Sequence, residues 1–297
     1  MNQAVKIKTQ TAFEVRPFKV YTHRQIDKIS TLQHISKDLL FEMKVVANVL
    51  PFRVNDYVIE QLIDWDNIPN DPIFQLTFPQ REMLKPESFE RMANLMKKDA
   101  SRQDIQKLAA VLQSELNPHP AGQMDLNVPA LEGETLAGMQ HKYKETVLFF
   151  PSQGQVCHSY CTFCFRWAQF VGDKELQFAA KEADSLHAYL AQHQEVSDVL
   201  LTGGDPLVMK TQKLDQYLTG FLKPELEHIQ TVRIGTKSLS FWPQRFVSDP
   251  DADDLLRSME KLVSEGKHVA LMAHYNHWQE MDTPIAHEAI KRIRNTG

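Results

Sequence analysis

The sequence predicts an α/β fold in which a mainly helical N-terminal region precedes a parallel sheet. In the C-terminal half, short apolar runs alternate four times with helical patterns, which is typical of parallel strands joined by right-handed crossovers. In the N-terminal half, the spacing of apolar residues is helical. We therefore expect three parts: an arm over residues 1–22, a helical region over 23–138 and an α/β core of about four β/α units over 139–297.

The N-terminal half is predicted to be helical between irregular stretches. The arm is expected to be irregular because it is polar and shows no apolar period. Helical spacing predicts helices over residues 25–49, 56–64, 86–96 and 102–116. Pro51 ends the first of these helices, because proline removes a backbone donor. Clusters of Pro and Asn predict irregular chain at residues 67–72 and 117–138.

The C-terminal half contains the predicted sheet. Apolar runs predict strands at residues 146–150, 197–202, 231–235 and 269–273. Helical patterns follow at residues 182–192, 213–221, 251–265 and 284–294. Ligands of parallel α/β folds bind at the carboxyl ends of the strands. Polar or cysteine-rich segments follow all four strands, at residues 155–167, 203–206, 236–237 and 274–277. We expect these segments to line one mouth.

The three cysteines of the chain are Cys157, Cys161 and Cys164, spaced as C-x3-C-x2-C. Three thiolates at this spacing can hold three irons of a [4Fe-4S] cluster, which leaves the fourth iron open to a small molecule. The alternatives are three ordinary buried thiols, or a zinc site completed by His158 or His141. Zinc sites usually bring a second C-x2-C pair from elsewhere, and the sequence has none. The pattern therefore favours the cluster.

Composition limits the other function classes. The chain has 297 residues, of which 42% are hydrophobic, enough for a sizeable core. The net charge is -5 and no long Lys/Arg run occurs, which argues against a nucleic-acid partner. No apolar stretch of about 18 residues predicts a membrane span, and the N-terminus has no signal-peptide core. An odd, clustered set of cysteines suggests a reducing cytoplasm.

From about residue 49 to residue 297, the chain resembles the lysine 2,3-aminomutase family of radical S-adenosylmethionine (SAM) enzymes. The resemblance rests on the cysteine loop with Phe165-Arg166 and on five further motifs: Leu50-Pro51-Phe52-Arg53-Val54, His141-Lys142-Tyr143, Leu201-Thr202-Gly203-Gly204-Asp205-Pro206-Leu207, Pro243-Gln244-Arg245 and His274-Tyr275-Asn276-His277. The cysteine motif alone would indicate only the radical SAM superfamily. The resemblance implies a partial, TIM-like radical SAM barrel and an isomerase.

The resemblance also implies the chemistry. A [4Fe-4S] cluster receives one electron from a reductant and passes it to SAM. SAM is thereby cleaved to a 5'-deoxyadenosyl radical. This radical takes a hydrogen atom from the β carbon of a small amino acid substrate. Pyridoxal phosphate (PLP) holds the substrate nitrogen, which migrates from the α to the β carbon. The protein orients the cofactors and the substrate, tunes the electronic properties of the cofactors and excludes water.

Residue roles follow from the same resemblance. The cluster ligands are Cys157, Cys161 and Cys164. The SAM contacts are Gly203, Gly204 and Asp205. Arg166 pairs with the substrate carboxylate, a bidentate role that suits a guanidinium group. The PLP phosphate is expected near Lys142 and Tyr143, and the residues that line the site are His274 and Asn276.

The sequence departs from the family pattern in several respects, which include Gly235 in place of a common histidine and Trp278 in place of an expected proline. Trp167 replaces a second arginine, which makes the substrate end more apolar, and residues 144–146 lack an arginine expected near the PLP phosphate. The family barrel has six units, and its PLP lysine would lie beyond Gly297. We therefore expect either a longer natural chain or a second chain, such as a homo-oligomer partner, over the open sheet edge. The alternatives are a PLP-independent radical SAM enzyme and an inactive fragment that binds SAM or the cluster.

Overall fold

The computed structural model describes residues 13–119, 122, 124–180 and 183–297. Residues 1–12 of the expected arm, residues 120, 121 and 123 of the second irregular stretch, and Glu182 at the expected helix start lie outside the described residues. The described end of the arm forms strand β1, Val20–Thr22, which pairs antiparallel with β2, Arg53–Asn55. A second two-stranded sheet is a hairpin of β3, Ala130–Leu131, and β4, Glu134–Thr135.

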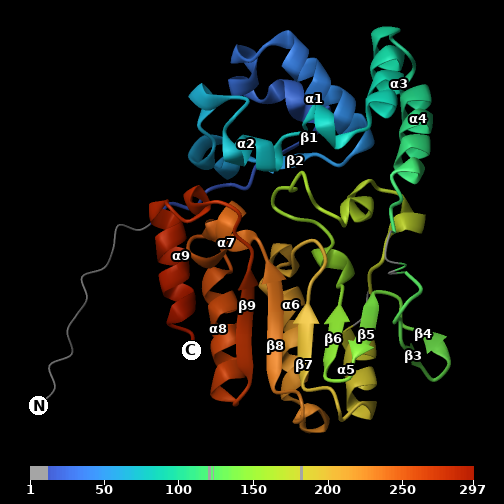
Figure 1. Cartoon of the computed structure of the whole chain (residues 1–297). Helices are drawn as coiled ribbons and strands as arrows, with labels where there is room; N and C mark the ends of the chain where they lie inside the picture. The colour runs from blue at the N-terminus through green and yellow to red at the C-terminus, as the bar shows by residue number, and fades with distance from the viewer. Residues whose placement is uncertain (1–12, 120–121, 123, 181–182) are drawn as a thin grey trace, which may run out of the picture.

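The central sheet has five strands in the order β5-β6-β7-β8-β9 (Figure 1). Their bounds are Met139–Tyr143, Thr146–Phe149, Asp198–Leu201, Thr231–Thr236 and His268–Ala273. Strands β6 to β9 are parallel, which confirms the four predicted strands and their direction. Strand β5 pairs antiparallel with β6 at the edge of the sheet and is not among the predicted strands.

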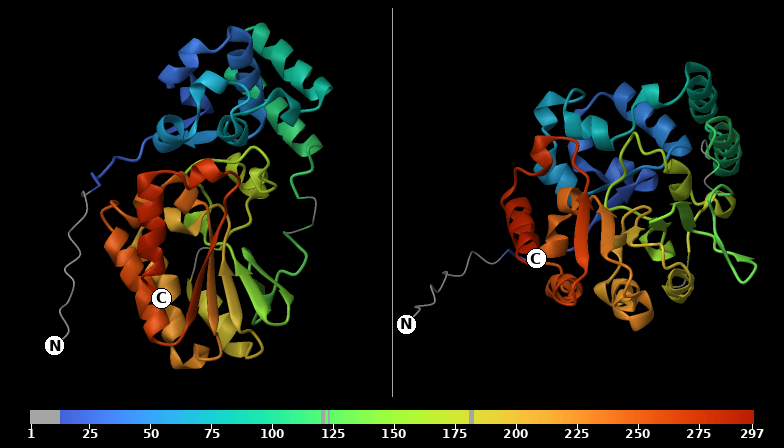
Figure 2. Two further views of the ribbon diagram at one scale, coloured as in Figure 1. Left: turned by 60° about the vertical axis from the view of Figure 1, so that its left-hand side comes forward. Right: turned by 60° about the horizontal axis from the view of Figure 1, so that its bottom comes forward.

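The helices follow the strands as expected. In the core, the bounds of α5 to α9 are Ala183–Gln192, Thr211–Leu218, Ser238–Phe241, Ala252–Ser264 and Pro284–Arg294. Helix α6 continues into a 3-10 helix, Thr219–Leu222, so the predicted helix over 213–221 is found in two pieces. Figure 2 shows the core helices gathered on one side of the sheet. The observed chain is therefore α/β with a sheet that is mainly parallel.

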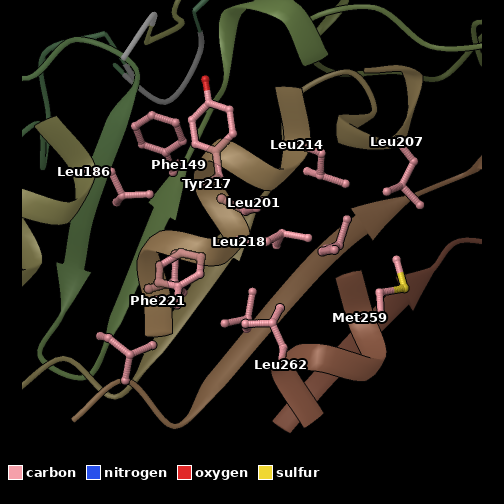
Figure 3. Close-up of a cluster of buried hydrophobic side chains, with 14 of the residues drawn as sticks. Phe149, Leu186, Leu201, Leu207, Leu214, Tyr217, Leu218, Phe221, Met259 and Leu262 are labelled. Atoms are coloured by element: carbon pink, nitrogen blue, oxygen red, sulfur yellow. The ribbon is translucent and has the colours of Figure 1, made fainter. Parts of the chain in front are cut away.

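The main core lies between the sheet and its helices. Alternate strand residues, such as Val147 and Phe149 in β6 or Val232 and Ile234 in β8, are buried toward the helices. Figure 3 shows Phe149 and Leu201 of the sheet beside Leu186, Leu214 and other helix side chains. Fully burying a side chain of this size stabilises the fold by about 1.5–3 kcal/mol. This core fixes the strand ends from which the site loops emerge.

The N-terminal region is helical, but its first predicted helix is wrong in extent. The expected helix over 25–49 is divided into two 3-10 helices, His23–Lys28 and Ser30–His34, and helix α1, Lys37–Val49. The break occurs because Ile35 is extended and the Ser36 side chain caps α1 by accepting a hydrogen bond from the backbone N–H of Leu39. Helices α3, Pro86–Lys97, and α4, Arg102–Glu115, match their predictions.

Helix α2, Pro72–Thr77, corrects the prediction of irregular chain at residues 67–72, which did not foresee a helix beginning there. Its start signal is present in the sequence: the Asp71 side chain accepts a hydrogen bond from the N–H of Phe74, and Pro72 occupies the first helical turn. The segment predicted as helical over residues 56–64 forms a short π-helix, Val58–Leu62.

The N-terminal helices stack over the carboxyl ends of the parallel strands (Figure 1). A second buried cluster includes Phe52 and Phe74 of this region together with Phe241 and Trp242 of the core. The Asn55 side-chain amide also donates to the carbonyl of Phe241 at 2.8 Å. These contacts join the two parts around the strand ends, where the site lies. Among the described residues, no helix combines the length and apolar character needed to cross a membrane.

Candidate active site

The cysteine loop begins directly after β6, at the carboxyl edge of the sheet. One turn of 3-10 helix, Ser152–Gly154, leaves the strand, and Cys157, Cys161 and Cys164 follow it. All three cysteines are free thiols and half-buried. The loop passes between the sheet and the N-terminal helices (Figure 1). The segment that carries the thiols therefore contacts both the sheet and the N-terminal helical region.

Hydrogen bonds to the N-terminal region hold the chain between the cysteines. The Ser159 hydroxyl accepts from the backbone N–H of Asn55 at 3.0 Å, and the N–H of Tyr160 donates to the carbonyl of Arg53 at 2.8 Å. The N–H and hydroxyl of Thr162 donate to backbone carbonyls of α2 at 2.8 and 2.9 Å. Protein contacts alone fix this loop, so the thiols lose little conformational freedom when they bind a ligand.

Each thiol has a basic neighbour. Burial raises the pKa of all three thiols, that of Cys161 to about 12. A nearby positive charge opposes this rise in each case, and the pairs are Cys157 with Arg53, Cys161 with Lys237 and Cys164 with Arg166. Metal ligation requires the thiolate, which a nearby cation stabilises. At Cys157 the nearby Asp205 carboxylate adds to the rise in pKa. The loop therefore has the donor atoms for a thiolate-bound metal centre, and a cation lies near each thiol.

The turn after β7 packs directly against the start of the cysteine loop. A Cβ atom on Gly204 would lie 2.5 Å from the backbone nitrogen of Val156, and one on Gly203 would collide with the Gln155 side chain. Gly203 also has φ of 138°, a conformation that favours glycine. The N–H of Asp205 donates to the carbonyls of Gly154 and Val156 at 2.9 Å each. Contact between two loops of the chain is sufficient to require these glycines.

Asp205 joins the loops after β7 and β8. Asp205 is buried, with 1% of its surface exposed. It accepts hydrogen bonds from the backbone N–H of Leu207 and Lys237 and from the hydroxyls of Thr236 and Ser238, all between 2.8 and 3.0 Å. Burial raises the pKa of Asp205, and these donors oppose the rise. A carboxylate with so many donors is a fixed structural centre rather than a group free to bind a ligand.

Lys237 and Glu280 form a buried ion pair that sequence reasoning missed. The Lys237 ammonium donates to Glu280 at 2.5 Å, to Asn276 Oδ1 at 2.8 Å and to the His274 carbonyl at 3.2 Å. The Glu280 side chain is fully buried and also accepts from the N–H of His277. The pair fixes the segment after β9 against the segment after β8. The position of Lys237 after a strand singles it out in the sequence, but no sequence pattern indicates its partner.

The predicted residues His274 and Asn276 lie next to the cysteine loop. The ring of Phe163, between Cys161 and Cys164, makes an edge contact with His274 at 6.0 Å between ring centroids. Asn276 is joined to this neighbourhood through Lys237. The segments after β6, β7, β8 and β9 therefore meet at one edge of the sheet, as the strand-end argument predicts.

Arg166 lies in the same neighbourhood and has no carboxylate partner among the described residues. Burial lowers its pKa to about 10, although the Cys164 and Cys157 thiols oppose this shift. Its guanidinium lies 4.3 Å from the centre of the Phe150 ring and donates to the Gln155 side chain at 3.1 Å, while its buried Nε has no hydrogen-bond partner. A buried guanidinium with free donor capacity suits a small anion.

Lys142 and Tyr143 are not brought to this edge. Tyr143 pairs with Thr146, the first residue of β6, so it lies at the amino end of β6. The cysteine loop begins at the other, carboxyl end of the same strand. Tyr143 is 62% exposed, and the Lys142 ammonium lies 5.5 Å from the centre of its ring. Neighbouring His141 uses both ring nitrogens, toward the Tyr189 hydroxyl and the Lys144 carbonyl. These residues therefore belong to the opposite edge of the sheet.

A cavity of about 250 Å³ opens beside the cysteine loop. Its wall combines Cys161, Cys164 and Trp167 with Leu50 and Leu116 of the N-terminal region. A larger cavity of about 700 Å³ lies between α6 and α8 and contains none of the sequence-predicted residues. The smaller cavity is the one that adjoins the candidate site, because two of the three cysteines, Cys161 and Cys164, are in its wall.

The donor type fits an iron-sulfur cluster, because Cys157, Cys161 and Cys164 are free thiols on one loop. Across residues 13–119, 122, 124–180 and 183–297, no group of three or more His, Cys, Asp or Glu side chains is placed to hold a single metal ion. A single ion needs ligands that converge on one point, whereas a [4Fe-4S] cluster takes each thiolate on a different iron. The two histidines considered for zinc are engaged elsewhere: His141 as described, and His158 with the Ser238 hydroxyl at 3.2 Å.

The fold and site define an α/β protein with a three-cysteine loop at the carboxyl edge of its sheet, and comparison with known proteins gives the family. A protein of Aquifex aeolicus that carries the provisional name L-lysine 2,3-aminomutase is 32% identical over 275 residues, 92% of this chain. The L-lysine 2,3-aminomutase of Bacillus subtilis is 30% identical over 207 residues, 69% of this chain. No family model matches. The chain belongs to the lysine 2,3-aminomutase family.

The comparisons cover only part of each relative. The chain spans 61% of the Aquifex protein and 40% of the Bacillus protein. The glutamate 2,3-aminomutase of Clostridioides difficile is 30% identical over 143 residues, 48% of this chain and 30% of that protein. The names of these relatives refer to different amino acids, so family membership alone does not identify a substrate.

Proposed function

We propose that this chain carries the cluster-binding and SAM-binding part of a radical SAM, PLP-dependent amino acid 2,3-aminomutase. This isomerase moves an α-amino group to the β carbon by way of a 5'-deoxyadenosyl radical. The proposal includes a partial TIM-like barrel in residues 139–297, a helical region in 23–138, an arm in 1–22, and a reducing cytoplasm as the site of action. Membership of the family and the three free thiols support it.

The observation that carries the proposal is the cysteine loop. Its three thiols lie on a segment anchored by protein hydrogen bonds, and each has a basic neighbour. The residues that would hold a [4Fe-4S] cluster are Cys157, Cys161 and Cys164. When bound, the cluster would supply one electron to SAM, and PLP would hold the substrate nitrogen.

The other residues of the site orient the reactants. Gly203, Gly204 and Asp205 would present the turn after β7 to the methionyl part of SAM. Arg166 would bind the substrate carboxylate with its free donor capacity. Trp167, in the wall of the cavity, would exclude water from the radical. His274 and Asn276 would line the site from the segment after β9.

Anaerobic reconstitution with iron and sulfide tests the proposal. We expect about four irons per chain, as for a single cubane cluster, and cleavage of SAM to 5'-deoxyadenosine and methionine after one-electron reduction. The Cys164→Ala variant should lose both, while Ser101→Ala, which removes an exposed helix cap far from the loop, should retain both. Colourless protein that binds zinc in place of iron would contradict the cluster assignment.

A PLP-independent radical SAM enzyme is the second candidate. It is favoured by the location of Lys142 and Tyr143, which lie at the edge of the sheet opposite the cysteine loop. A PLP phosphate held there would be separated from the thiols by the length of β6. The chain spans only part of its relatives, so the test uses reconstituted protein of the relatives' full length. In equilibrium dialysis with PLP, retention of about one PLP per chain supports the aminomutase, and SAM cleavage without PLP retention supports the alternative.

A further inference from the structure

We propose that Asp205 acts through Ser238 and His158 as a positioning residue for Cys157. The inference rests on the proposed function, because it treats Cys157 as a cluster ligand. It goes further by assigning a role to His158, which neither the motif nor the chemistry above uses. The three side chains come from the turn after β7, the segment after β8 and the cysteine loop itself.

The contacts form a continuous chain of hydrogen bonds. The Ser238 hydroxyl lies 3.0 Å from Asp205 Oδ2 and 3.2 Å from His158 Nδ1. Asp205 and Ser238 are almost fully buried, and His158 is 7% exposed. Water therefore has little access to replace any of these bonds, and a buried polar group that loses its partner is left without a substitute.

The direction of the hydrogen bonds follows from the donors around Asp205. Two backbone N–H groups, from Leu207 and Lys237, can only donate, and the Thr236 hydroxyl lies within hydrogen-bond distance of both carboxylate oxygens. An ionised carboxylate accepts all of these bonds and the Ser238 hydrogen as well. Since that hydroxyl hydrogen points at Asp205, the Ser238 oxygen must accept from His158. The geometry thus places a hydrogen on His158 Nδ1.

The rest of the His158 ring is fixed by aromatic contacts. Trp242 stacks with it at 6.3 Å between ring centroids, and Phe18 meets it edge-on at 5.4 Å. These contacts on two sides restrict rotation of the ring away from Ser238. Because His158 directly follows Cys157 in the chain, a fixed ring also fixes the backbone from which the Cys157 side chain extends. Asp205 thereby couples the turn proposed to contact SAM to the first cluster ligand.

A measurement on cluster-free protein tests the relay independently of the proposed function. In isotopically labelled protein, the imidazole nitrogen shifts should show a hydrogen on His158 Nδ1. Ser238→Ala should abolish this single tautomer and raise amide hydrogen exchange over residues 157–161 about tenfold, the effect of losing one buried hydrogen bond. A His158 hydrogen on Nε2 in the unaltered protein would overturn the proposal.

The matched control is Ser240→Ala. Ser240 is fully buried in the same short helix, α7, but its hydroxyl donates to Glu280 at 2.8 Å and not to the relay. This variant should lose comparable stability while His158 keeps its tautomer and residues 157–161 keep their exchange rates. If both serine variants changed the His158 tautomer and the exchange rates of residues 157–161 equally, the changes would reflect a general loss of packing. That result would overturn the positioning role.

A second pair of variants keeps the proposal testable if Ser238→Ala does not fold. The Asn amide nitrogen in His158→Asn can occupy the place of Nδ1 and donate to Ser238, whereas His158→Ala cannot. After reconstitution, His158→Asn should retain the reduction potential and the electron paramagnetic resonance line shape of the cluster, and His158→Ala should shift or broaden both. Identical spectra in the two variants would overturn the proposal, while absence of iron in the unaltered protein would instead refute the proposed function.

Discussion

The two ends of strand β6 differ sharply, although the same family resemblance assigns function to both. At its carboxyl end, the cysteine loop is half-buried, anchored by hydrogen bonds from the N-terminal region and flanked by cations. At its amino end, Lys142 and Tyr143 form the exposed end of strand β5, where the described contact between their side chains is a cation–ring pair. The comparison shows that motifs which a family resemblance groups together can lie at opposite edges of one sheet.

The largest expected effect is at the carboxyl end. Replacing Cys157 with Ala should abolish stable cluster binding, because a third thiolate cannot be supplied elsewhere in a chain that has only three cysteines. Iron and sulfide analysis after anaerobic reconstitution would measure this. A Cys157→Ala variant that still binds about four irons would contradict the assignment of Cys157, at the carboxyl end of β6, as a cluster ligand.

The buried ion pair should dominate stability at the same edge. Removing one partner from a buried pair typically costs roughly 3–5 kcal/mol, so Glu280→Gln should lower the free energy of unfolding by about this amount at neutral pH. Asp198→Asn is the control: it breaks a more exposed pair with Arg233 at the amino edge and should cost about 1 kcal/mol or less. Urea unfolding of both variants measures the difference. Equal losses would contradict it.

The Glu280 contribution should also depend on pH. Burial raises the pKa of Glu280, but the Lys237 ammonium and the N–H donors of Asn276 and His277 lower it more, so the folded value lies below the ordinary 4.5. The stabilisation is therefore complete above the unfolded pKa and is lost as the pH falls through the folded one. Unfolding curves of the unaltered protein and Glu280→Gln should converge below about pH 4.5. A gap that stays constant down to about pH 3 would argue against the ionised pair.

Arg166 should affect turnover rather than cluster binding. Arg166→Lys keeps a positive charge but loses the planar pair of donors, and we expect a roughly hundredfold loss in kcat/KM, the scale of a buried hydrogen-bonded charge pair. Iron content and SAM affinity should stay unchanged. Full-length protein and the cognate amino acid are needed for the rate, and an iron content that falls with the rate would assign Arg166 to the cluster instead.

The smallest effect is expected at the amino end. Lys142→Gln should weaken PLP binding by about tenfold or less, because an exposed cation contributes little to binding a phosphate. Equilibrium dialysis measures the change, with Lys144→Gln, an exposed lysine in the turn that follows β5, as the control. A complete loss of PLP in the first variant alone would show that Lys142 is a main phosphate contact.

The sequence is informative where one physical rule dominates. Apolar runs predict β6 to β9, because the strand residues that face the helices are buried, and the strand-end rule gathers the cysteine loop with His274. Sequence reasoning fails where partners are distant. Glu280 lies 43 residues from Lys237, and Ser238 lies 80 residues from His158, so no local period signals either pair. Strand β5 is missed because its polar residues 141–143 match a binding motif and show no apolar run.

Gly204 has a consequence for how mutational screens of such proteins are interpreted. Even alanine at this position would force the backbone of Val156 to move, and Cys157 is the next residue. The variant would lose its colour and its response to SAM together, and a screen would assign the glycine to nucleotide recognition. The true defect would be a misfit between two adjacent turns, which only a structure of the variant could distinguish from a lost ligand contact.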